Sequence, residues 1–119
     1  MKKLRKAEEI SVMLVDDHPA FRKGMAALIA REPGLVVIAQ TGNGKEALDV
    51  ARQTPVDVVL TDLAMPGGIN GIDLLKNLKQ LRPHCEVILM TAYGTVETAV
   101  EAMKFGADDF VTKPFKRVQ

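Results

Sequence analysis

The sequence predicts an α/β fold built on a single doubly wound, five-stranded parallel sheet. Four segments are apolar at consecutive positions, which is typical of strands covered on both faces: 11–17, 35–40, 56–62 and 86–92. A fifth, weaker strand is expected at 108–113. Helical patterns fall between these segments, and strict alternation of strand and helix favours a parallel sheet with right-handed crossovers.

Four connecting segments carry apolar residues at helical spacing, around 21–29, 47–51, 72–78 and 96–103. Pro19 suits the first turn of the first helix, and Gly106 suits the end of the fourth. A fifth helix should cover the last strand, but only four residues follow "KPF". We therefore expect the fifth helix to be truncated or absent in this sequence.

The composition is that of one globular domain. The 119 residues are 47% hydrophobic, which is enough for one core. A net charge of +1 and an aromatic content of 4% argue against a nucleic-acid-binding surface on this domain. The single cysteine, Cys85, excludes an internal disulfide and fits a reducing compartment.

The start of the chain is basic but lacks the apolar core of a signal peptide. We expect residues 1–9 to be a flexible leader and residues 10–119 to form the domain. No apolar run approaches the roughly 18 residues that a membrane span requires. The expectation is a cytoplasmic protein that makes no membrane contact.

Polar side chains follow four of the five predicted strands. In open parallel sheets, ligands bind outside the carboxyl ends of the strands, where the strand order reverses. At those ends the sequence places three acids, a hydroxyl and a lysine: Asp16, Asp17, Asp62, Thr91 and Lys113. Any one of these could be structural, but the whole set at one edge predicts a site.

The three acids indicate a cation. Two carboxylates about 5 Å apart repel by roughly 3 kcal/mol at an effective dielectric of about 20, so three together need a positive partner. Oxygen ligands with few protein donors favour Mg²⁺. Asp62, at the end of a central strand, is the best-placed nucleophile for phosphorus. Lys113 and Thr91 would then contact the phosphoryl oxygens.

The motifs "VDDHP", "LTDLAMPGG", "MTAYGT" and "FVTKPF", in that order, resemble the receiver domain of two-component response regulators. The resemblance covers about residues 10 to 116. It implies the flavodoxin-like strand order 2-1-3-4-5 and a phosphoacceptor at Asp62. It also implies a Mg²⁺ site formed by Asp16, Asp17, Asp62 and the backbone carbonyl of Ala64.

The same resemblance implies a switch. Thr91 would be the switch hydroxyl, Lys113 the phosphate-binding lysine, and Phe110 the aromatic residue that turns inward on activation. Ala64 and Tyr93 would tune hydrolysis of the acyl phosphate, although simple loop filling is an alternative for both. Such a domain catalyses only its own phosphorylation and dephosphorylation, so it is not expected to be an enzyme.

The implied partners are a sensor histidine kinase or phosphotransfer protein, a DNA-binding output domain, and a second copy in a phosphorylation-linked homodimer. The first half of the chain resembles receivers joined to helix-turn-helix domains of the quorum-regulator type. The second half resembles receivers of nitrogen-regulation activators. We therefore expect phosphorylation to switch the face formed by the fourth helix and fifth strand and so control transcription.

The same residues argue against two other functions. A flavin-binding domain would need a hydroxyl-rich loop after the first strand, where this chain has "DDHPAF". A haloacid-type phosphohydrolase would need a second aspartate where Ala64 stands. His18 could ligate a metal, but its place before Pro19 favours a role in helix entry. One departure from the family is an extra residue in "MPGGING", where we expect a mobile loop.

Overall fold

The computed structural model describes residues 9–65, 68–92 and 96–113. Strands and helices alternate along the chain as β1 (Ile10–Val15), α1 (Pro19–Ala30), β2 (Leu35–Thr41), α2 (Gly44–Gln53), β3 (Val58–Asp62), α3 (Gly71–Leu81), β4 (Glu86–Thr91), α4 (Val96–Lys104) and β5 (Asp109–Thr112). All four strand pairings are parallel, and the order is β2-β1-β3-β4-β5. The predicted fold class and strand order are confirmed.

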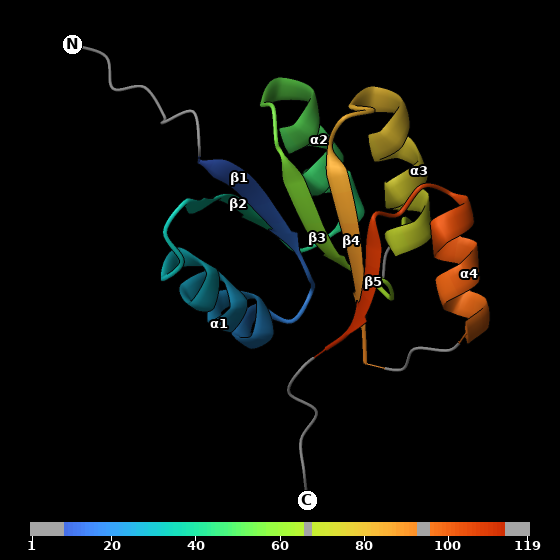
Figure 1. The fold of residues 1–119 in the computed structure, drawn as a ribbon, viewed down its shortest axis with the longest axis horizontal. Coiled ribbons are helices and arrows are strands. Elements are labelled where there is room, and N and C mark those ends of the chain that lie inside the picture. Colours follow the sequence, from blue (N-terminus) through green and yellow to red (C-terminus); the bar gives the residue numbers. More distant parts are fainter. Residues whose placement is uncertain (1–8, 66–67, 93–95, 114–119) are drawn as a thin grey trace, which may run out of the picture.

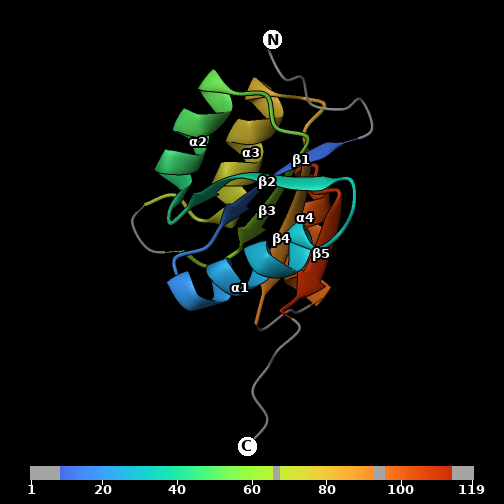
Figure 2. The same ribbon diagram turned by 90° about the vertical axis from the view of Figure 1, so that its left-hand side faces the viewer.

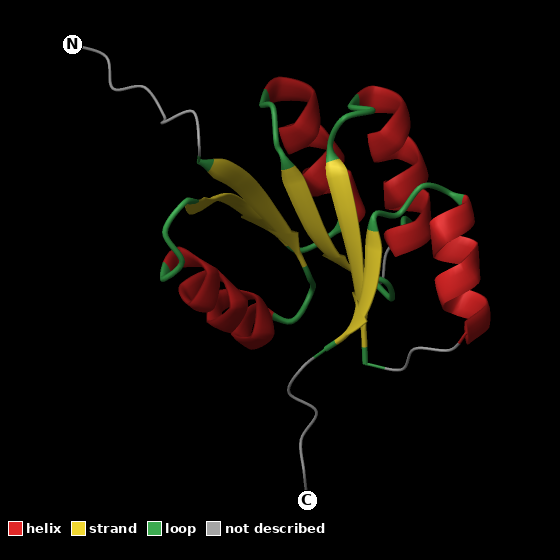
Figure 3. Ribbon diagram, in the orientation of Figure 1, coloured by secondary structure: helices red, strands yellow, loops and turns green. Residues whose placement is uncertain are grey.

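The sheet separates two unequal helical layers. Helices α2, α3 and α4 cover one face, and α1 lies on the other (Figures 1 and 2). Figure 3 shows the strands side by side between these layers. Residues 114–119, where a fifth helix would begin, lie outside the described residues, so the expected truncation or absence of that helix stays a prediction. None of the described helices is long and apolar enough to cross a membrane.

The main core lies between the sheet and the layer of α2 and α3. It contains alternate strand residues and the inner faces of both helices, including Met13, Val15, Leu48, Val59, Leu74, Leu75, Leu78, Val87 and Leu89. Since successive strand residues point to opposite faces, the same strands also present apolar side chains towards α1. The consecutive apolar runs therefore correspond to strands with two apolar faces.

Two helices are less buried than their apolar stripes suggest. Helix α1 has no buried residue, and Leu28 is 53% exposed. In α4, Val96 and Val100 are exposed, and the small residue Ala102 is fully buried. The close contact of α4 with its neighbours is thus made by a small side chain, and the larger apolar residues face outward.

The strand order defines where a ligand would bind. The chain moves outward from β1 to β2 and then returns to place β3 on the other side of β1. Helices α1 and α3, which follow β1 and β3, consequently leave the carboxyl ends of these strands on opposite sides of the sheet, which opens a crevice between them. Asp16 and Asp17 follow β1 directly, and Asp62 is the last residue of β3.

Candidate functional site

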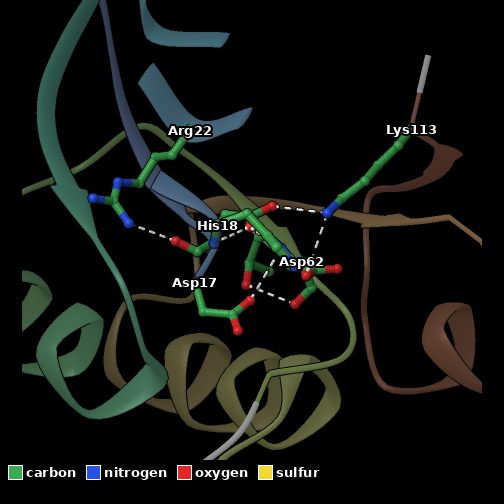
Figure 4. Close-up of polar contacts among 7 residues, drawn as sticks. Asp17, His18, Arg22, Asp62 and Lys113 are labelled. Carbon is green, nitrogen blue, oxygen red and sulfur yellow. Dashed lines mark hydrogen bonds and ion pairs between the residues drawn. The ribbon is translucent and has the colours of Figure 1, made fainter. Parts of the chain in front are cut away.

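Three of the predicted site residues converge at this crevice. The Lys113 Nζ atom lies 3.0 Å from Asp16 Oδ2 and 3.4 Å from Asp62 Oδ2, although the three residues come from distant parts of the sequence (Figure 4). Asp16 is 1% exposed and Asp62 is 4% exposed. One ammonium group therefore bridges two carboxylates that are almost completely removed from water.

Burial sets the electrostatics of Asp62. Desolvation raises the pKa of its carboxyl group above the usual value, and repulsion from Asp16 raises it further. Lys113 and a backbone hydrogen bond from Ala64 act in the opposite direction without cancelling the shift. Burial also tends to lower the pKa of Lys113, but its contacts with Asp16 and Asp62 outweigh burial and raise that pKa overall.

Residues of α1 complete the surroundings of Asp16. The backbone N–H of His18 donates to Asp16 Oδ1 at 2.8 Å, and Arg22 Nη1 donates to the Asp16 backbone carbonyl at 2.6 Å. The ring of Phe21 lies against the ammonium group of Lys113, with 4.4 Å between Nζ and the ring centroid. The start of α1 therefore holds both Asp16 and Lys113 in place.

Arg22 and Phe21 were not among the predicted site residues. Their position in the sequence could have indicated them. They lie about one helical turn after the acid pair, and side chains at this position in α1 point back over the end of β1. An arginine or phenylalanine at such a position is common for other reasons, so the residue types alone do not predict these contacts.

The donor set fits a divalent cation. Asp16, Asp17, His18 and Asp62 each offer one ligand atom, and these four atoms lie within 4.8 Å of one another. Asp16 Oδ2 and Asp17 Oδ1 are both buried, and Asp16 Oδ2 is paired with the Lys113 ammonium group, whereas Asp17 Oδ1 accepts no hydrogen bond from the described residues. The groups that approach them are Lys113 and His18. Asp17 Oδ1 is therefore the buried carboxylate oxygen that a bound cation would satisfy.

Thr91 and Phe110 lie where the sequence placed them. Thr91 is the last residue of β4 and is buried, and its carbonyl accepts a hydrogen bond of 2.8 Å from the Lys113 backbone N–H. This bond fixes the end of β5 beside the end of β4. Phe110, in β5, is half-buried and packs against the main core.

Ala64 lies two residues after Asp62 and is exposed at the rim of the crevice. Its backbone contacts the Asp62 carboxylate through the hydrogen bond that counters the pKa shift. Tyr93, the other residue expected to tune hydrolysis, lies outside the described residues.

The start of α3 fixes the backbone of Asp62. Gly71 begins this helix, and its N–H donates to the Leu63 carbonyl at 2.8 Å. A Cβ atom on Gly71 would lie 2.6 Å from the Asp62 carbonyl oxygen, so the helix can approach the strand end only with glycine at this position. The site therefore depends on a close backbone contact as well as on its polar side chains.

The loop before α3 includes the extra residue noted in the sequence. Residues 66–67 lie outside the described part of the chain, but residues 68–70 are described. Ile69 packs against the core, and its side chain would clash with a Cβ on Gly44 at the start of α2. The described part of the loop is thus anchored to the neighbouring helix by an apolar contact. The mobility expected for this loop stays a prediction.

We predict that Lys113→Met lowers the free energy of unfolding by roughly 2 kcal/mol at pH 7, because two buried carboxylates lose their cation. The loss should shrink in acid, where the carboxyl group of Asp62, whose pKa burial raises, becomes protonated and no longer needs a positive partner. Urea denaturation at several pH values would measure this trend.

Arg52→Met is the matched control for Lys113→Met. It breaks an ion pair with Asp49 in which both side chains are more than half exposed. Such a pair should cost less than about 0.5 kcal/mol at any of these pH values. Equal losses for the two variants would contradict the inferred importance of Lys113.

Comparisons with known proteins agree with this geometry. The family model "Response regulator receiver domain" matches residues 12–119. The transcriptional regulatory protein FixJ of Azorhizobium caulinodans is 42% identical over 108 residues, and the match covers 91% of this chain and 50% of FixJ. This chain thus spans about half the length of that relative.

Two solved structures show the same fold. A LuxR-family response regulator from Aurantimonas sp. SI85-9A1 superimposes with a TM-score of 0.84 at 35% identity, covering 89% of this chain and 75% of that one. The beryllofluoride-activated NtrC4 receiver domain dimer gives a TM-score of 0.78 at 31% identity, covering 89% and 85%. The two classes that the sequence resembles are therefore both represented. These matches favour the receiver over the flavin-binding and phosphohydrolase alternatives.

Proposed function

The chain belongs to the response regulator receiver family, and on that premise we propose that it accepts a phosphoryl group on Asp62 from a sensor histidine kinase or a phosphotransfer protein. The observation that carries the proposal is the placement of the Asp62 carboxylate. It ends a buried central strand, 3.4 Å from the Lys113 ammonium group and beside Asp16. Of the acids in the crevice, Asp62 alone terminates a strand at the centre of the sheet.

In the transfer step, a carboxylate oxygen of Asp62 attacks phosphorus and forms an O–P bond. The N–P bond to the donor imidazole breaks, and its electron pair stays on the imidazole nitrogen, which takes up a proton. Asp16, Asp17, Asp62 and the Ala64 carbonyl would hold Mg²⁺, which when bound neutralises charge on the phosphoryl oxygens. Lys113 contributes a second positive charge from the side of β5.

Phosphorylation then changes the charge at the end of β3 and biases a two-state element. The Thr91 hydroxyl would turn towards the phosphoryl group, and Phe110 would fill the space that Thr91 leaves. Because β4 and β5 are neighbours and α4 joins them, such a change would reshape the face of α4 and β5. Ala64 and Tyr93 would set the access of water to the acyl phosphate and so its lifetime.

The remaining parts of the proposal concern the setting. We infer a receiver domain over residues 10–119, working in the cytoplasm and not itself contacting nucleic acid. The leader expected over residues 1–9 lies outside the described residues except for Glu9. The output would be DNA binding, supported by the similarity to a transcriptional regulatory protein and a LuxR-family regulator. A phosphorylation-linked homodimer is supported by the likeness to a receiver domain dimer. The chain acts on no separate substrate in this scheme.

The proposal is tested by finding which residue becomes phosphorylated. The purified chain, incubated with acetyl phosphate and Mg²⁺, should gain one phosphoryl group that is labile to hydroxylamine, as acyl phosphates are. Peptide mapping after borohydride reduction should place the modification at Asp62. Labelling that stays absent under these conditions, or that maps to another residue, would refute the proposal.

A further inference from the structure

The His18 side chain occupies an unusual position for a residue that starts a helix. His18 is the N-cap of α1, but its side chain makes no capping hydrogen bond. Its extended backbone, with φ −99° and ψ 102°, fits the residue before Pro19. Helix entry is therefore accomplished by the main chain, and the imidazole ring is available for another role.

The ring is directed at the acid pair. His18 Nδ1 lies 3.1 Å from Asp16 Oδ1 and 3.3 Å from Asp17 Oδ1 (Figure 4). Lys113 contacts the other oxygen of Asp16, so the two nitrogen groups approach this carboxylate through different oxygen atoms. Asp16 Oδ1 also accepts a hydrogen bond of 2.8 Å from the His18 backbone N–H, so a cation bound at Asp17 Oδ1 would meet the imidazole nitrogen before it met the ammonium group.

We propose that His18 is an additional ligand of the cation site and makes it accept borderline divalent cations, such as Zn²⁺ and Co²⁺, more readily than its carboxylates alone would. The inference rests on the cation site of the proposed function. It concerns which metal the site prefers: the ligand atom is His18 Nδ1, and the ions are borderline divalent cations.

Ligand chemistry supports this assignment. Magnesium strongly prefers oxygen donors, whereas an imidazole nitrogen suits zinc and other first-row transition metals. A zinc ion bound at about 2.0–2.2 Å by nitrogen and oxygen ligands holds neighbouring ligand atoms roughly 3 to 4 Å apart. The four candidate atoms already lie within 4.8 Å of one another, so small side-chain rotations would bring them to that spacing.

The exposure of the His18 side chain also supports its assignment as a metal ligand. The His18 side chain is 65% exposed and that of Asp16 is 1% exposed. The ring thus stands at the mouth of the crevice, in contact with water, while the carboxylate forms its floor. An exposed ring can rotate towards an incoming ion without unpacking the core.

The experiment is calorimetric titration of the whole chain with Zn²⁺, Co²⁺ and Mg²⁺ in separate runs, without a phosphoryl donor. A pH of about 8 keeps an ordinary imidazole neutral. We expect His18→Ala to weaken Zn²⁺ and Co²⁺ binding at least about tenfold, and to change Mg²⁺ binding less than about twofold. The visible absorption of bound Co²⁺ should also change when the nitrogen ligand is lost.

His84→Ala is the matched control. The chain has two histidines, and His84 is exposed in the loop before β4, at the opposite edge of the sheet. This variant should bind all three ions as the wild type does. Zn²⁺ binding to His18→Ala within twofold of the wild type, or an equal loss for Zn²⁺ and Mg²⁺, would overturn the proposal. Failure of the proposed function would appear separately, as wild-type protein that takes no label with Mg²⁺.

Discussion

Replacing Asp62 by asparagine is expected to abolish phosphoryl uptake and, at neutral pH, to make the protein more stable. The first effect follows because an amide oxygen is too weak a nucleophile to form the O–P bond. The second follows because the carboxylate that performs the reaction is buried beside Asp16, and neutralising it removes both desolvation and repulsion. The same burial that serves the proposed chemistry therefore costs folding free energy.

The pH dependence of this stabilisation has a definite sign. The folded protein raises the pKa of Asp62 above its unfolded value, so folding favours the protonated carboxyl group. The associated stability is fully present below the unfolded pKa and is lost as the pH rises through the folded pKa. Asparagine does not titrate, so the advantage of Asp62→Asn should appear across that window and persist at neutral pH.

Urea denaturation at pH 3 to 8 would measure this difference, which should be absent in acid and appear as the pH rises through the folded-state pKa of Asp62. Lys113 limits the gain, because the mutation leaves it with Asp16 as its remaining carboxylate partner in the site. Asp49→Asn, on the exposed surface of α2, is the control and should keep wild-type labelling and nearly wild-type stability. An Asp62→Asn protein that still took up label at the wild-type rate would rule out Asp62 as the acceptor.

The fold and the polar residues of the site could be predicted because both follow from the strands. An apolar run that ends in a charged residue marks where a buried strand reaches the sheet edge, and parallel strands bring all such ends to one edge. The end of the strand at which an acid stands decides the edge of the sheet on which it lies. Asp57, at the beginning of the same segment that ends at Asp62, binds Ser11 through its carboxylate at the opposite edge.

The contacts made by α1 and α4 could not be predicted in the same way. Helical spacing predicts which residues share a face, but how deeply that face is buried depends on which elements cover it. Leu28 and Val100 belong to apolar stripes and yet are more than half exposed. The orientation of His18 likewise depends on a side-chain rotation that helix signals do not specify.

The second large effect is expected for Gly71→Ala, which should lower the free energy of unfolding by roughly 3 kcal/mol. A Cβ at this position would lie 2.6 Å from the Asp62 carbonyl oxygen and 2.7 Å from Leu63 Cα. Both atoms belong to the backbone, so no side-chain rotation relieves the clash. Either α3 must move away from the sheet, or the end of β3 must shift.

Each of these movements also displaces Asp62, so Gly71→Ala should slow phosphoryl uptake even at temperatures where the variant remains folded. Gly24→Ala separates this effect from a general response to losing a glycine. Gly24 lies within α1, where an added Cβ would have no described atom within 4 Å apart from the helix's own nearby backbone, so alanine there should stabilise the helix by about 0.5–1 kcal/mol. Thermal unfolding and initial labelling rates, measured on both variants, would test the argument. If Gly71→Ala matched the wild type in thermal stability and in labelling rate, the close approach of α3 to β3 could not be what orients Asp62.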